Sequence, residues 1–274
     1  MYELRYVKKR KAKIIAAISA GVATTVISTF AIVSFLGRYV GTFTVSLDTG
    51  KVELALSEKL DFKKKESYLR IDTLPSFHEF TYSNLPSDEV LDSEETNYLH
   101  GAIYKDDGIT LSSMNYFKYT FYVRNVGKVP ARYNVRVGIT DNKAGEGDRS
   151  LDDTLRVLLF ETNMETSAQM LRQVYAKKSA VHHIDDKGNA DFREAVSVPL
   201  EKADSGQPFL GYAEMFETKD TIATLKPDSI GSGETRRYTI VNWLEGYDPQ
   251  SDNFSAPPKG ARLKLGVEIN AYEN

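Results

Sequence analysis

The stretch YFKYTFYVRNVGKVPARYNVRVGIT, residues 116–140, decides the fold because apolar side chains recur in it at every second position. Successive side chains of a β-strand point to opposite faces, so this period of two predicts two strands that each bury one face. A turn at Asn125–Gly127 separates them, which is typical of a hairpin. The predicted inward residues are Phe117, Tyr119, Phe121 and Val123 before the turn, and Tyr133, Val135, Val137 and Ile139 after it.

The same alternation extends over most of the chain beyond residue 42. Residues 43–47 and 52–56 alternate on either side of Asp48–Gly50, which predicts a second hairpin. Residues 263–271 alternate most clearly, whereas 155–160 and 236–244 are apolar on both faces and predict strands that are covered on both sides. A short helix is expected around Ser167–Gln173. Many short strands separated by turn signals predict an all-β fold, an antiparallel β-sandwich of jelly-roll or Ig-like topology, over residues 42–274.

The composition restricts the classes of function. The chain of 274 residues has no cysteine, which excludes disulfides, thiolate metal sites and a cysteine nucleophile. Residues 1–41 hold seven of the 35 Lys and Arg residues and one of the 38 Asp and Glu residues, so the remainder has a net charge of −9. Binding to phosphate groups needs clustered positive charge, and an acidic body therefore argues against a nucleic-acid partner.

The first forty residues predict a membrane segment. Residues 1–13 are basic, and residues 14–37 are uncharged and long enough to span a hydrocarbon core of about 30 Å. The positive-inside rule keeps the basic segment in the cytoplasm and places residues 42–274 outside the cell. A cleaved signal peptide is the alternative, but Phe35 and Tyr39 fit a signal-peptidase site poorly. We therefore expect an uncleaved, single-pass signal anchor that contacts the lipid bilayer through residues 14–37.

Other motifs offer little evidence of catalysis. Asp48 in DTG and Asp204 in DSG resemble the paired aspartates of an aspartic protease, but only Asp48 follows an apolar strand, and Asp and Gly are common in turns because both suit positive φ. His182 and His183 are adjacent and would point to opposite faces of a strand, so they do not share one metal ion easily. We therefore expect no enzymatic activity and no cofactor.

The stretch YTIVNWLEGYDPQSDN, residues 238–253, holds the single tryptophan and three carboxylates. Glu245, Asp248 and Asp252 are the candidates for a calcium site, although their order does not match a calcium loop and Pro249 interrupts them. The alternation places Val241 and Trp243 on one face of a strand, which favours a core position for the tryptophan over a sugar-stacking platform.

Two of these stretches carry a family resemblance. FKYTFYVRNVG with ARYNVRVGI resembles the hairpin of TasA/CalY (camelysin)-type extracellular matrix and surface proteins of Firmicutes. LKPDSIGSGETRRYTIVNWLEG is similar to a strand of related surface proteins, and the resemblance covers about a third of the chain. It implies a jelly-roll or Ig-like fold and assembly through donated N-terminal strands. The donated segment would then be Thr42, Phe43, Thr44, Val45, Ser46 and Leu47.

Together these observations predict a structural or interaction protein of the cell surface, which acts in adhesion, matrix or envelope assembly and associates with itself or with other surface proteins. The first alternative is an extracellular module that binds a glycan or calcium. The second is an anchored hydrolase.

Overall fold

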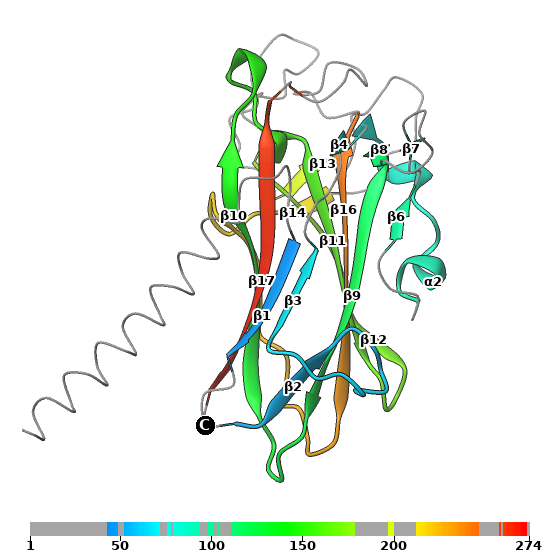
Figure 1. Ribbon diagram of the computed structural model, residues 1–274, viewed down its shortest axis with the longest axis vertical. Coiled ribbons are helices and arrows are strands. Elements are labelled where there is room, and N and C mark those ends of the chain that lie inside the picture. Colours follow the sequence, from blue (N-terminus) through cyan, green and yellow to red (C-terminus); the bar gives the residue numbers. More distant parts are fainter. Residues whose placement is uncertain are drawn as a thin grey trace, which may run out of the picture. The chain divides into compact units, whose positions relative to one another are not determined.

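The computed structural model describes residues 43–48, 52–71, 76–77, 79–93, 98–100, 103–104, 111–178, 197–199, 212–246, 258 and 260–272. Two mixed β-sheets pack face to face in this part of the chain, as in a β-sandwich (Figure 1). The predicted all-β class is thereby confirmed. The jelly-roll or Ig-like assignment stays a prediction, and the predicted span at residues 14–37 lies outside the described residues.

The smaller of the two large sheets, sheet A, has five strands in the order β15-β10-β17-β1-β3. The strands of sheet A are β1 (Phe43–Asp48), β3 (Tyr68–Ile71), β10 (Arg132–Lys143), β15 (Thr221–Leu225) and β17 (Arg262–Tyr272). Strand β1 runs parallel to β17, with Phe43 opposite Leu265 and Asp48 opposite Asn270. The N-terminal described strand therefore lies beside the C-terminal one.

The larger sheet, sheet B, has nine strands in the described part of the chain. Its main path runs β13-β14-β12-β11-β16-β9-β2, while β5 pairs with β16 and β6 pairs with β9. The bounds are β2 (Leu54–Ser57), β5 (Glu79–Phe80), β6 (Tyr98–His100), β9 (Tyr116–Asn125), β11 (Leu155–Asn163), β12 (Ala168–Ala176), β13 (Ser197–Pro199), β14 (Tyr212–Met215) and β16 (Thr235–Glu245).

The remaining elements are short. A small sheet of three strands has the order β4-β8-β7. Its strands are β4 (Ser76–Phe77), β7 (Ile103–Tyr104) and β8 (Leu111–Met114), and the helical turns are η1 (Tyr82–Asn84), α2 (Asp88–Leu91), η2 (Glu146–Asp148) and η3 (Leu151–Asp153).

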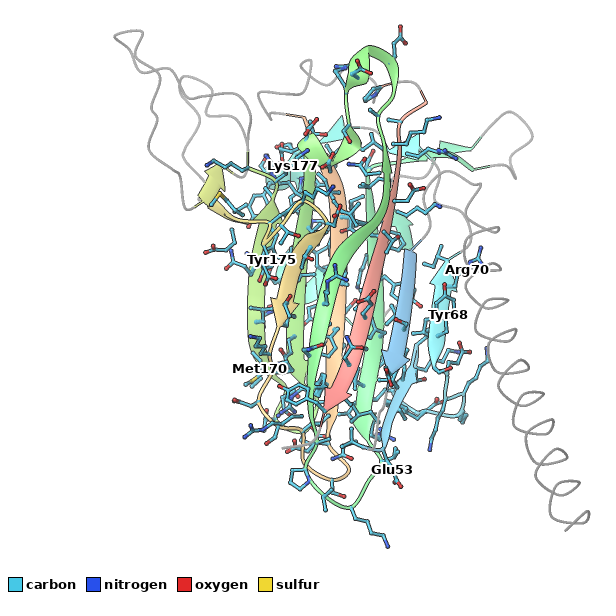
Figure 2. All side chains as sticks on the ribbon, turned by 90° about the vertical axis from the view of Figure 1, so that its left-hand side faces the viewer. Glu53, Tyr68, Arg70, Met170, Tyr175 and Lys177 are labelled. Carbon is cyan, nitrogen blue, oxygen red and sulfur yellow. The ribbon has the colours of Figure 1, made fainter. Side chains whose placement is uncertain are left out.

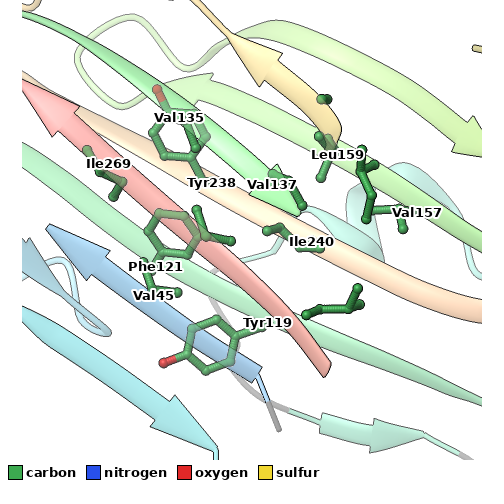
Figure 3. Packing of buried hydrophobic residues seen from close by; sticks show 14 of the residues in the cluster. Val45, Tyr119, Phe121, Val135, Val137, Val157, Leu159, Tyr238, Ile240 and Ile269 are labelled. Atoms are coloured by element: carbon green, nitrogen blue, oxygen red, sulfur yellow. The ribbon is translucent and has the colours of Figure 1, made fainter. Parts of the chain in front are cut away.

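The main core fills the space between the two sheets (Figure 3). The alternating residues predicted to face inward on β9, β10 and β17 contribute to it, and Phe121 stacks on Tyr238 at 5.4 Å between ring centroids. The hydroxyls of Tyr133 and Tyr238 form a 2.7 Å hydrogen bond, which joins the two sheets. Burial raises the pKa of both phenols, so this bond joins two neutral groups at neutral pH.

A second core lies on the outer face of sheet B. Trp243, Val241 and Phe160 are buried there against residues 79–93, which we call the covering segment and which contain β5, η1 and α2. The sequence correctly predicts that β11 and β16 are covered on both faces and that Val241 and Trp243 are buried. The prediction that this strand, β9, buries only one face is wrong, since Lys118 and Thr120 on its other face are 2% and 0% exposed.

Both predicted hairpins are wrong. Strands β1 and β2 lie in different sheets, and so do β9 and β10. Alternation specifies which side chains face a core, but it does not name the partner strand, and both members of each pair point into the same inter-sheet core. The prediction of a purely antiparallel sandwich is also wrong, because β1 pairs with β17, and β12 with β14, in parallel. Such pairs join segments far apart in sequence, and no local turn marks them.

The helix expected around Ser167–Gln173 is instead strand β12. Residues such as Ala168, Gln169 and Leu171 favour helices intrinsically, but propensity is a weak preference. Pairing with β11 from Ala168 to Ala176 overrides it. Ser167, with a φ of 56°, ends the tight turn that reverses the chain.

Candidate functional site

The predicted calcium ligand Glu245 is the last residue of β16 and is fully buried. Its Oε2 accepts hydrogen bonds from the Trp243 indole Nε1 at 2.9 Å and from the backbone N–H of Tyr82 at 3.0 Å. The Tyr82 and Trp243 rings pack with their centroids 6.0 Å apart. The carboxylate therefore fastens the covering segment to the end of β16.

The other two predicted ligands, Asp248 and Asp252, lie outside the described residues. Within the described ranges, no group of three His, Asp or Glu side chains is placed to hold a metal ion. Asp48, at the end of β1, is exposed, and its proposed partner Asp204 lies outside the described residues, as do His182 and His183.

The predicted donated segment is built into its own chain. Five of its six residues, 43–47, belong to β1, and Thr42 lies outside the described part of the chain. Val45 is 0% exposed and belongs to the inter-sheet core, while Leu47 packs at the border of that core. The Ser46 hydroxyl donates a hydrogen bond to the Val267 carbonyl of β17 at 3.4 Å. The other edge of β1 pairs with β3. Strand β1 thus lies between β17 and β3 (Figure 1).

Sequence reasoning missed a buried polar cluster around Asp92, which follows helix α2 in the covering segment. Its carboxylate accepts hydrogen bonds from Thr162 at 2.6 Å and from Thr239 at 3.1 Å, both on the outer face of sheet B. Arg237 contacts both carboxylate oxygens, at 3.1 and 2.9 Å, and also donates to the Asp92 backbone carbonyl at 2.6 Å. The Asp92 side chain is only 8% exposed, and the Arg237 side chain is 11% exposed.

Further polar contacts attach the covering segment along its length. The Lys118 ammonium donates to the Val90 carbonyl at 3.1 Å and to the Ser93 hydroxyl at 2.9 Å. Arg172 of β12 reaches the Asp88 carboxylate and the Tyr82 hydroxyl. A signal for this arrangement was present in the sequence, because the predicted two-sided burial of β16 requires something to cover its second face. The sequence did not show that residues 79–93 provide the cover.

No family model, no curated protein and no solved structure matches this chain. None of the helices in the described ranges has the length and apolar character needed to cross a membrane.

Proposed function

We propose that the protein is a single-pass, membrane-anchored surface protein with a structural or interaction role, in which residues 14–37 form the anchor and the sandwich-like body lies outside the cell. The basic and then apolar N-terminus and the acidic remainder of the chain support this topology. The resemblance to TasA/CalY-type surface proteins supports a role in adhesion, matrix or envelope assembly.

The observation that carries the proposal is the place of β1. Five residues, 38–42, connect the predicted span to this strand, and β1 is an inner strand of sheet A (Figure 1). The body thus begins with a strand that is integral to its fold, so the chain leaves little free linker between the predicted anchor and the sandwich. A short connection suits a protein that holds its body at the surface.

The position of β1 also gives strand donation a physical basis. The strand contributes the buried Val45 and ladder hydrogen bonds to β17 and β3, and β2 then continues in the other sheet. The same segment of a second copy would restore identical contacts, which is why exchange of an identical element is a low-cost route to assembly. We propose that surface-displayed copies associate by this exchange.

Engineered cysteines test the exchange, and the absence of native cysteine makes the experiment clean. Ser46 of β1 lies opposite Glu268 of β17, and neighbouring strand positions are within disulfide distance. We expect Ser46→Cys with Glu268→Cys to give a ladder of disulfide-linked chains when the protein is oxidised on cells and run on a non-reducing gel.

The Glu268→Cys substitution also removes the surface ion pair between Glu268 and Arg136. This loss should change the free energy of unfolding by about 0–1 kcal/mol, so the variant should still fold.

Each single-cysteine variant is the matched control, since neither can form a product longer than a dimer. If the double variant gives only monomer with an internal disulfide and no free thiol, β1 stays in its own chain and exchange is excluded.

A further inference from the structure

Strand β1, the segment proposed to be exchanged, is paired into sheet A along both of its edges. It runs parallel to β17 on one side, with Val45 opposite Val267, and antiparallel to β3 on the other, with Val45 opposite Leu69. A strand whose ladder hydrogen bonds occupy both edges leaves its sheet sideways only after one neighbour has moved away. Strand exchange therefore requires that β17 or β3 separates from β1.

Strand β17 is the more firmly held of these two neighbours. It lies inside sheet A, and its other edge pairs with β10 from Arg132 to Lys143. Leu265, Val267 and Ile269 bury their side chains in the inter-sheet core. Moving β17 away from β1 would therefore disrupt this core and the middle of the sheet.

Strand β3 has fewer contacts that oppose its separation. It is four residues long, lies at the edge of sheet A and pairs with no described strand other than β1. Among its four described residues only Leu69 is buried, at 2% exposed, whereas Tyr68 is 39% exposed. Figure 2 shows Tyr68 and Arg70 on this outermost strand, at the side of the sheets. Strand β3 is thus the neighbour that separates more easily.

The chain that precedes β3 is attached to sheet B. The Glu66 N–H donates to the Leu56 carbonyl of β2 at 2.9 Å. The Arg124 guanidinium of β9 donates to the Leu60 carbonyl at 3.0 Å and lies over the Phe62 ring, 4.1 Å from its centroid. Because these contacts do not involve β1, β3 can pivot at its N-terminal end while the preceding loop stays in place.

We propose that β3 is the gate of strand exchange: it pivots at its N-terminal end, releases β1 and closes again on the β1 of a second copy. This inference rests on the proposed strand exchange and adds the step that controls its rate. The Leu47 N–H donates to the Ser67 carbonyl at 3.0 Å, and Val45 lies opposite Leu69. These contacts are the same whichever copy supplies β1. The gate therefore sets how fast copies exchange strands and leaves the contacts of the assembled state unchanged.

Hydrogen–deuterium exchange of the full-length chain in lipid nanodiscs, followed by mass spectrometry, tests the gate. In the wild type we expect the amides paired between β3 and β1 to exchange hydrogen faster than those between β17 and β10, because β3 opens without unfolding of the body. Leu69→Ala removes the buried side chain of β3. This variant should speed hydrogen exchange in β3 and β1 by at least about 10-fold and leave β17 unchanged.

Leu159→Ala is the matched control, because Leu159 is also 2% exposed and belongs to the same core, but lies on β11 of sheet B. It should leave hydrogen exchange in β3 and β1 unchanged, which separates opening of the gate from a general loss of stability. Leu69→Val, a smaller truncation, should give the pattern of Leu69→Ala with a smaller increase, and it replaces the alanine variant if that variant does not fold.

The gate is excluded if β1, β3 and β17 exchange hydrogen at one common rate, or if Leu69→Ala and Leu159→Ala change β3 alike. The disulfide ladder of Ser46→Cys with Glu268→Cys decides strand exchange separately. A ladder together with one common rate of hydrogen exchange would leave strand exchange standing without the gate. Faster hydrogen exchange at β3 without a ladder would overturn strand exchange itself, and with it the role of β3 as its gate.

Discussion

Replacing Trp243 by alanine is expected to lower the free energy of unfolding by about 3–5 kcal/mol, the usual loss for a large aromatic side chain in a core. Trp243 is 0% exposed and is among the largest side chains of the second core. Its removal opens a void beneath Tyr82 and takes away the indole donor to Glu245. Because the chain has no other tryptophan, unfolding in urea should be followed by circular dichroism rather than by fluorescence.

Trp243→Phe separates the two contributions. Phenylalanine keeps an aromatic ring against Tyr82 but cannot donate to Glu245, so we expect a smaller loss than for alanine. If the free energy of unfolding of Trp243→Ala lies within about 1 kcal/mol of the wild-type value, the tryptophan is not a core residue. The second core on sheet B would then need a different explanation.

Replacing Asp92 by alanine is expected to lower the free energy of unfolding by about 3–5 kcal/mol, as is typical when one partner of a buried ion pair is removed. The Arg237 guanidinium would keep its contact with the backbone carbonyl of residue 92 but would lose the carboxylate. Thr162 and Thr239 would also lose their acceptor. Chemical denaturation measures the loss.

Asp88→Ala is the matched control, because Asp88 lies in the same covering segment but pairs with Arg172 where both side chains are about one-third exposed. Its loss should be about 0–1 kcal/mol. A second variant, Asp92→Ala with Arg237→Met, removes both buried charges and should be more stable than Asp92→Ala alone. If Asp88→Ala and Asp92→Ala lower the free energy of unfolding equally, the buried polar cluster around Asp92 does not hold the covering segment on sheet B.

Much of the inward-facing pattern was predictable from the sequence, because one periodicity governs it. Phe121, Tyr133 and Val267 face the core as their alternation requires. Strand partners were not predictable in the same way, since the parallel neighbour of β1 comes from the other end of the chain. A two-residue period is compatible with many partners, and only long-range packing selects one.

The polar sites were harder to predict, for a related reason. Lys118 in an alternating strand is the usual mark of a solvent-facing side, and only the covering segment turns that side into a second core. Asp92 follows a four-residue helix that has no strong periodic pattern. Its importance comes from Thr162, Arg237 and Thr239, which are distant in sequence. The sequence named Glu245 only as a candidate calcium ligand, and the described contacts of its carboxylate attach the covering segment to the end of β16.

The placement of the body outside the cell is tested most directly by labelling single cysteines in intact cells. Lys128 is exposed in the β9–β10 loop, and Lys8 belongs to the basic segment expected in the cytoplasm. We predict that a membrane-impermeant maleimide labels Lys128→Cys in intact cells and labels Lys8→Cys only after permeabilisation. Labelling of Lys8→Cys in intact cells, with Lys128→Cys protected, would contradict the account.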